Sequence, residues 1–308
     1  MASYFYPLIC SIAAPLLLLL QVYPGIALLL GACASLLINQ EHHRAIVSRL
    51  SKRMLGCSIV AYGLSMHIDS IVALSIDYLP ATLSGIILAL TAAIALGRLL
   101  KIDALLAVLI GSGTAICGAS AIASVATATK AQAEKVSMAL GVVLMLNAVG
   151  LITFPFIGHL CVLSSESFAV WAGLAIHDTS SVVGAALSYD PSSVDTATTV
   201  KLARAIWIAP LTVLCARYFL PQERSYALSL PWFIWGYLIA ALLNSSVALP
   251  QTTTALFTTA ARMGFVVGIF YIGATIDVRK IIQLGARPCL LGIAVWIVSA
   301  MWSFMLIK

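Results

Sequence analysis

Apolar runs of about 20 residues are the feature that most constrains how this chain can fold. A helix of about 20 residues spans the ~30 Å hydrocarbon core of a bilayer. Transmembrane strands would instead show alternating segments of about ten residues. Because unpaired backbone groups are costly in hydrocarbon, the runs predict an all-α integral membrane protein.

The composition supports this prediction. Charged residues make up only 9% of the 308 residues and hydrophobic residues 62%, whereas soluble domains carry about 25% charged residues. Most of the surface must therefore face lipid. The net charge of +6 does not indicate a nucleic-acid partner, because the basic residues sit mainly in a few short loops and form no patch with interleaved aromatics.

About eleven apolar segments are expected, at residues 7–20, 22–39, 54–75, 82–99, 104–128, 136–158, 167–188, 197–219, 230–249, 254–277 and 288–306. No polar stretch between them is long enough for a soluble domain. Residues 1–308 are thus predicted to form a single polytopic transmembrane domain. The first segment is interpreted as a membrane helix, because the N-terminus lacks the basic region of a signal peptide.

The distribution of Lys and Arg predicts the orientation, because cytoplasmic loops are enriched in both. Residues 76–81 and 250–253 contain neither and are placed outside. The N-terminus is then cytoplasmic and the C-terminus outside, in the inner membrane of a bacterial cell. The loops placed in the cytoplasm carry Arg44, Arg49, Lys52, Arg53, Arg98, Lys101, Arg217, Arg224, Arg279, Lys280 and Arg287.

Segments 104–128 and 167–188 do not fit a simple succession of spans. If both cross the membrane, Lys130 and Lys135 lie outside and residues 159–166, which contain no Lys or Arg, lie inside, against the rule. If both are re-entrant, every loop obeys it. The alternative is a pair of broken spanning helices. Both interpretations interrupt the two segments near the middle of the membrane.

The first interrupted segment contains Gly111-Ser112-Gly113-Thr114 and Cys117-Gly118-Ala119-Ser120. Glycines and hydroxyls are expected to break the helix here, and a half-helix starting near Gly118 would point its positive end at the break, where it can bind an anion. The alternative is a small-residue packing face. The candidate binding residues are Thr114, Cys117, Gly118, Ala119 and Ser120.

The second interrupted segment contains His177-Asp178-Thr179-Ser180-Ser181, and residues 175–186 resemble residues 115–126. Ionisable residues inside the membrane are costly and usually functional. Asp178 can also cap the following half-helix. His177 can carry a coupling proton or act as a structural donor. All five residues are candidates, and we expect the two interruptions to meet in one solute site.

Three basic residues lie within the later apolar segments: Lys201, Arg204 and Arg262. The arginines can snorkel to the outer interface, pair with Asp178, or add positive charge to a cavity. Two arginines against one nearby acid favour an anionic solute.

Nothing in the sequence indicates an enzyme. HExxH, GxSxG, P-loop and paired-carboxylate patterns are absent, so no cofactor is expected. The cysteines form no CxxC or metal-ligand spacing and are interpreted as packing residues, which leaves no metal site. A redox protein using Cys117 would need a partner thiol or base. The seven cysteines are Cys10, Cys33, Cys57, Cys117, Cys161, Cys215 and Cys289.

The sequence resembles the YeiH-like sulfate exporter family, part of the cation:proton antiporter and anion transporter superfamily. The resemblance covers most of the chain, although Ser180-Ser181 replace the Ala-Gln of many members. The stretches that carry it are Gly111–Ile122, Ile176-His177-Asp178, Lys201-Leu202-Ala203-Arg204 and Gly285–Gly292.

The resemblance implies a core domain with crossing interrupted helices beside a scaffold domain, and elevator-like movement. Together with the residues above, it predicts a secondary active transporter of a small anion such as sulfate, sulfite or a sulfonate. The partners would be this anion, the lipid bilayer and a second copy docked through the scaffold helices. A cation:proton antiporter using Asp178 remains the alternative.

Overall fold

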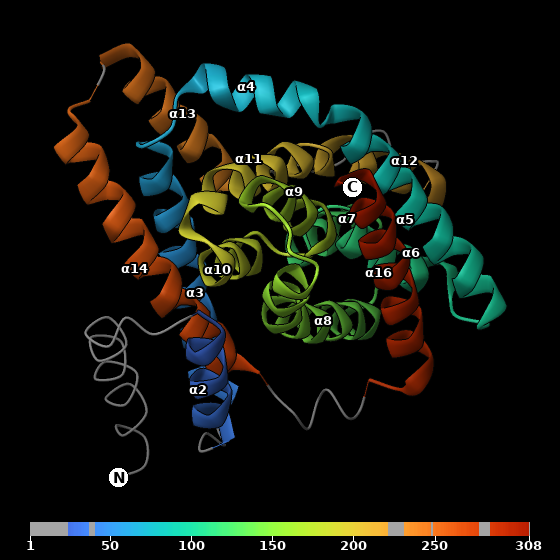
Figure 1. Cartoon of the computed structure of the whole chain (residues 1–308). Coiled ribbons are helices and arrows are strands. Elements are labelled where there is room, and N and C mark those ends of the chain that lie inside the picture. Colours follow the sequence, from blue (N-terminus) through green and yellow to red (C-terminus); the bar gives the residue numbers. More distant parts are fainter. Residues whose placement is uncertain (1–23, 37–40, 221–230, 248, 277–283, 308) are drawn as a thin grey trace, which may run out of the picture.

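Helices make up all the regular structure in the computed structural model over the residues that it describes, which are 24–36, 41–220, 231–247, 249–276 and 284–307 (Figure 1). The predicted segment 7–20, Arg224, Arg279 and Lys280 lie outside these residues. The elements are α2 (Pro24–Leu36), α3 (Glu41–Gly63), α4 (Ile68–Asp77), α5 (Leu79–Leu99), α6 (Ala104–Ala115), α7 (Ala119–Ala128), α8 (Ala133–Leu160), α9 (Ser165–Ala175), α10 (Thr179–Tyr189), the 3₁₀ turn η1 (Pro191–Ser193), α11 (Val194–Ala205), α12 (Ile208–Phe219), α13 (Trp232–Val247), α14 (Gln251–Thr275) and α16 (Ala286–Ile307).

The helices form two groups. We call α2, α3, α13 and α14 the scaffold, and α5 to α12 with α16 the core; α4 runs between the two groups (Figure 1). Within the scaffold, α2 and α14 touch backbone to backbone. A Cβ on Gly31 would lie 2.1 Å from the Phe270 carbonyl oxygen, and one on Gly273 would lie 2.2 Å from that of Leu28. Small residues allow such close approach between membrane helices.

The predicted boundaries agree with the structure except around α3. The expected span 54–75 is wrong, because α3 already starts at Glu41 and meets α4 at a bend of 105°. The basic stretch from Arg44 to Arg53 is therefore helical and not a loop. Every fourth residue of this stretch is buried, namely Val47, Ser51 and Leu55, and α3 packs against α14. The charged residues between these positions are exposed.

Helices α6 and α7 form a re-entrant pair. The Lys135 ammonium lies 2.9 Å from the Asp103 carboxylate, so the start of α8 lies beside the start of α6. Asp103 also caps α6 by accepting from the Leu106 N–H. The hydrogen bond from Lys135 lowers the pKa of Asp103 below its usual value. Because both ends of the pair lie together, the chain enters and leaves on one side.

Helices α9 and α10 form the second re-entrant pair, at the opposite end of α8. The Ser165 hydroxyl donates to the Asp190 carboxylate, and the Tyr189 hydroxyl donates to the Leu163 carbonyl. The 28 residues of α8 separate this end from the first by about 42 Å. The re-entrant prediction is confirmed for both segments, and the spanning alternative is wrong.

Charge is divided between the two ends of the molecule. The end at Asp103 and Lys135, which we call the basic end, also holds Arg98, Lys101 and the starts of α3 and α16. The opposite end, the acidic end, carries Asp77, Glu166, Asp190 and Asp195. This separation is the one that the Lys and Arg pattern predicts for a membrane protein with a fixed orientation.

Candidate functional site

The tips of the two re-entrant pairs meet inside the core. A Cβ on Gly118 would lie 3.6 Å from the Asp178 Cβ, and the His177 Nε2 lies 3.2 Å from the Thr114 hydroxyl oxygen. Four helix ends therefore converge at one place, which we call the crossing. They are the C-terminal ends of α6 and α9 and the N-terminal ends of α7 and α10. The prediction that the two interruptions meet is confirmed as geometry, and solute binding there stays a prediction.

The first interruption depends on Gly118 and not on the preceding glycines. Gly118 has φ +62° and ψ −124°, a conformation that side chains disfavour. Helix α6 runs unbroken through Gly111 and Gly113, so the expectation that they break it is wrong. They allow close packing: a Cβ on Gly111 would lie 2.6 Å from that of Ala93, and one on Gly113 would lie 2.9 Å from Ile122.

The C-terminal ends of α6 and α9 are neutralised by cations from α11. Arg204 is only 2% exposed, and its guanidinium donates to the carbonyls of Thr114, Ala115 and Leu174. Lys201 donates to the Ile176 carbonyl. The last carbonyls of a helix lack partners within it and carry a partial negative charge, so cations are favoured there.

These contacts correct the roles considered for Arg204. It neither snorkels nor pairs with Asp178, because its donors are committed to backbone carbonyls of both re-entrant pairs. Trp296 of α16 adds a further bond, from its indole N–H to the Ala175 carbonyl at 3.1 Å. No sequence pattern singles out Trp296, because a tryptophan in an apolar run usually indicates only packing.

The N-terminal ends of α7 and α10 are built differently from each other. Asp178 caps α10, one of the two roles considered for it, by accepting from the Ser180 N–H at 3.2 Å and from the Ser180 hydroxyl. Asn147 of α8 accepts the Asp178 N–H at 3.1 Å. Helix α7 begins at Ala119, its N-cap Gly118 supplies no side-chain cap, and the Cys117 thiol interacts with the Ala121 N–H and the Ser120 hydroxyl. The backbone N–H groups of Ala119 and Ser120 remain at this N-terminus.

Exposure separates the candidate residues into two sets. Ala119, Ser120 and Asp178 are partly exposed, whereas the remaining candidates at the crossing are buried. The Nδ1 atom of buried His177 has no hydrogen-bond partner among the described residues. The buried candidates are Thr114, Cys117, Gly118, His177, Thr179, Ser180, Ser181 and Arg204. A solute at the crossing would thus meet Ala119, Ser120 and Asp178 first.

Arg262 belongs to a different cluster. It interacts with the Tyr62 hydroxyl, which donates to Asp195 of α11. Nearby, the hydroxyls of Thr199 and Tyr237 lie 3.2 Å apart. This cluster joins scaffold and core near the acidic end. The argument that sets two arginines against the one acid Asp178 is therefore wrong for Arg262.

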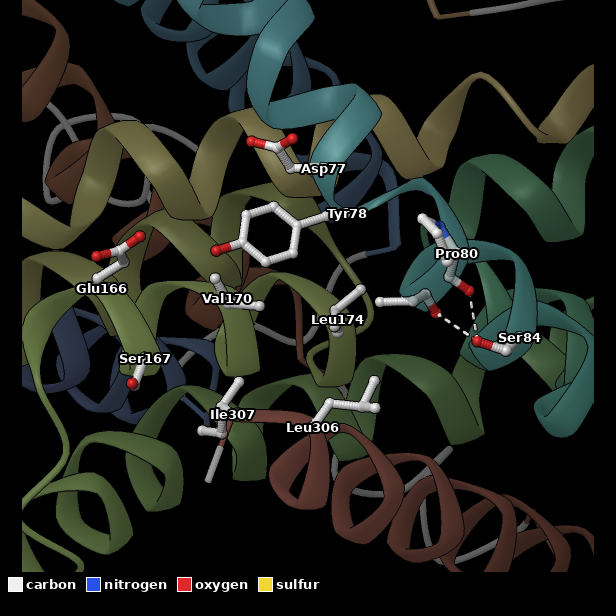
Figure 2. A pocket seen from close by; sticks show the side chains of 11 residues that line it. Asp77, Tyr78, Pro80, Ser84, Glu166, Ser167, Val170, Leu174, Leu306 and Ile307 are labelled. Carbon is white, nitrogen blue, oxygen red and sulfur yellow. Dashed lines mark hydrogen bonds between the residues drawn. The ribbon is translucent and has the colours of Figure 1, made fainter.

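A cavity of about 510 Å³ opens at the acidic end between α4, α5, α9 and α16. In Figure 2 the Tyr78 hydroxyl points toward Glu166 and Asp77 lies above the Tyr78 ring, and Leu174 also lines the cavity. The Leu174 carbonyl is one of those bound by Arg204. None of the residues at the N-termini of α7 and α10 lines this cavity, and its carboxylates would repel an anion.

Comparison with known proteins identifies the family. The family model described as conserved hypothetical protein 698 matches residues 8–292. A UPF0324 membrane protein of Bdellovibrio bacteriovorus is 38% identical over 300 residues, covering 95% of this chain and 92% of its own. One from Geobacter sulfurreducens is 35% identical, covering 92% and 90%. A third, from Bacteroides thetaiotaomicron, is 35% identical, covering 91% and 84%.

No solved structure matches this chain. The family match and the relatives agree with the resemblance to YeiH-like proteins and with the all-helical fold. The chain belongs to the UPF0324 family of membrane proteins.

Proposed function

We propose that this protein is a secondary transporter of a small anion, with its solute site at the N-terminal starts of α7 and α10. The observation that carries the proposal is the convergence of two re-entrant pairs from opposite ends of the molecule. Interrupted helices that meet near the middle of the membrane are a recurring way to build transporter sites, because their free backbone groups can bind the solute.

The charges at the crossing favour an anion. Lys201 and Arg204 lie at the crossing together with the single carboxylate of Asp178, and with both protonated they supply two positive charges against one negative charge. The partial charges of two helix N-termini and two C-termini, about half a charge each, cancel. About one positive charge is left, which a compact anion would balance. Sulfate, the solute that the family resemblance implies, and the related sulfite and sulfonates fit this charge and can accept a hydrogen bond from the partly exposed Ser120 hydroxyl.

The competing function is cation:proton antiport through Asp178. The partial exposure of this carboxylate at the crossing favours that alternative. The two buried cations nearby oppose it, because they would repel a second positive charge. His177 is assigned a hydrogen-bonding role, since its Nε2 bonds Thr114 and its ring lies deep among buried residues.

We place the protein in a bacterial cell membrane with the basic end in the cytoplasm. Lys101, Lys130 and Lys135 all follow this assignment once both re-entrant pairs are recognised. The acidic end then faces the outside.

This orientation predicts the labelling of two exposed loop residues. A cysteine at Gln132 is expected to react with a membrane-impermeant thiol reagent only from the cytoplasmic side, and one at Ser192 only from outside. Both would be introduced after the native cysteines are removed. The reverse pattern would invert the orientation, and labelling of both from one side would contradict the re-entrant pairs.

Anion flux tests the solute site. In proteoliposomes, we expect uptake of sulfate, sulfite or taurine that is lost in Ser120→Leu, because leucine adds bulk and removes a donor where the two N-termini meet. Ser120 is preferred over Ser180, which is buried against Asp178 and whose replacement would disturb the cap. A pH gradient in the same vesicles shows whether protons are coupled.

Ser246→Leu is the matched control, because this exposed serine of α13 bonds only within its own helix. It should transport as the unmodified protein does. Flux of Na⁺ or K⁺ against protons, without anion flux, would establish the antiporter instead. Full anion flux in a folded Ser120→Leu protein would remove the crossing as the solute site.

A further inference from the structure

A narrow apolar groove of about 330 Å³ lies on the outside of the core between α5, α6 and α12. Leu90 and Ile94 form one wall, Val108 another, and Leu211 and Leu214 the third. Leu214 is 65% exposed. In a membrane protein such an outward-facing apolar surface meets lipid, so lipid is the first candidate to fill this groove.

The groove has one charged end. It follows α5 from Leu90 to Arg98, a distance of about 12 Å at helical rise. Arg98 lies at the basic end of the molecule, where α5 gives way to α6. Tyr218, which is 75% exposed, lies at the same end of the groove. Arginine and tyrosine both favour the membrane interface, where lipid headgroups lie. A groove with these residues at one end and apolar walls along its length therefore suits a lipid with its headgroup at Arg98 and an acyl chain along the walls.

The Arg98 side chain is available for such a ligand. Over the part of the chain that the structure describes, no acceptor forms a hydrogen bond or ion pair with its guanidinium, and the residue is exposed. Exposed Lys101 follows it after one turn. Guanidinium groups bind phosphate oxygens through charge-assisted hydrogen bonds.

We propose that this groove binds an anionic phospholipid of the leaflet at the basic end, with an acyl chain along α5 and α12 and the phosphate at Arg98. One wall belongs to α6, whose C-terminal carbonyls bind Arg204 at the crossing. A bound lipid would thus support the first re-entrant pair from outside. The proposal depends on the membrane location of the protein and not on which solute it transports.

The test uses the whole protein purified in a neutral detergent, with phosphatidylglycerol and phosphatidylcholine of identical chains. We expect phosphatidylglycerol to bind more tightly by native mass spectrometry and to raise the thermal midpoint more. Arg98→Gln should reduce its affinity roughly fivefold, the contribution of one basic residue at an anionic surface, and leave phosphatidylcholine unchanged. Arg287→Gln, which changes an exposed arginine at the same end outside the groove, should change neither.

Filling the groove separates lipid from other occupants. Ala104→Phe adds a ring at an exposed residue of the groove wall and should weaken both lipids, and Leu214→Trp on the opposite wall should do the same. Equal phosphatidylglycerol binding by Arg98→Gln and the unmodified protein would overturn the proposal. So would a lipid-free dimer that Ala104→Phe dissociates, because a second copy would then occupy the groove.

Discussion

Arg204→Met is expected to destabilise the protein more than any other single change in the core. It would leave the carbonyls of Thr114, Ala115 and Leu174 without a donor in a buried place. Each unsatisfied buried acceptor costs roughly 1–3 kcal/mol, so the loss should reach several kcal/mol. Thermal unfolding in detergent should show a large fall in the midpoint and reduced recovery of folded protein.

Two further variants sharpen this prediction. Arg204→Lys keeps the positive charge, but a single ammonium group cannot reach all three carbonyls that the guanidinium binds. The thermal midpoint of this variant should therefore lie between those of Arg204→Met and the unmodified protein. Arg217→Met removes an exposed arginine near the basic end of α12 and should have little effect. If Arg204→Met is as stable as Arg217→Met, the carbonyl contacts do not hold the crossing together.

Gly118→Ala is expected to abolish anion flux and to lower stability. The φ of +62° with ψ of −124° is nearly restricted to glycine, and forcing a side chain into it costs roughly 1–3 kcal/mol. The added Cβ would find ordinary contacts, 3.5 Å from Val143 and 3.6 Å from Asp178, so space is not the obstacle. The backbone would turn instead, and the start of α7 would leave the crossing.

This cause makes a distinguishing prediction. Gly118→Ala and Gly118→Ser should lose flux to the same extent, because both carry the same backbone cost. Gly25→Ala is the control, since a Cβ on this glycine within α2 would meet only Leu151, at 3.8 Å. Normal flux in Gly118→Ala, measured beside that control, would show that the start of α7 tolerates another geometry.

Local patterns predicted the elements well. The segments expected at 136–158, 254–277 and 288–306 correspond to α8, α14 and α16 with shifts of a few residues. Apolar length and helical rise decide these boundaries, and both can be read along the chain. The boundary expected for α3 is wrong because the many charges between Arg44 and Arg53 suggest a loop. Apolar and small residues in the same stretch, Val47, Ser51 and Leu55, nevertheless follow a helical period.

The roles of the buried cations could not be predicted in this way. Arg204 and the carbonyls of Thr114 and Leu174 are separated by 90 and 30 residues, and no pattern in the sequence marks a backbone carbonyl as an acceptor. A buried arginine near one acid looks like half of an ion pair. Only the packing of α11 against both re-entrant pairs shows that its partners are helix ends.

By itself the sequence determined that the chain forms membrane helices, where they lie, and which two are interrupted, because these follow from local hydrophobicity and from polar residues that lipid excludes. Only the tertiary structure excluded the spanning alternative, showed that the tips meet at Gly118 and Asp178 in particular, and placed Arg262 with Tyr62 elsewhere. The physical reason is that contacts such as Lys135 with Asp103 depend on how distant helices pack, and local propensity carries no information about that packing.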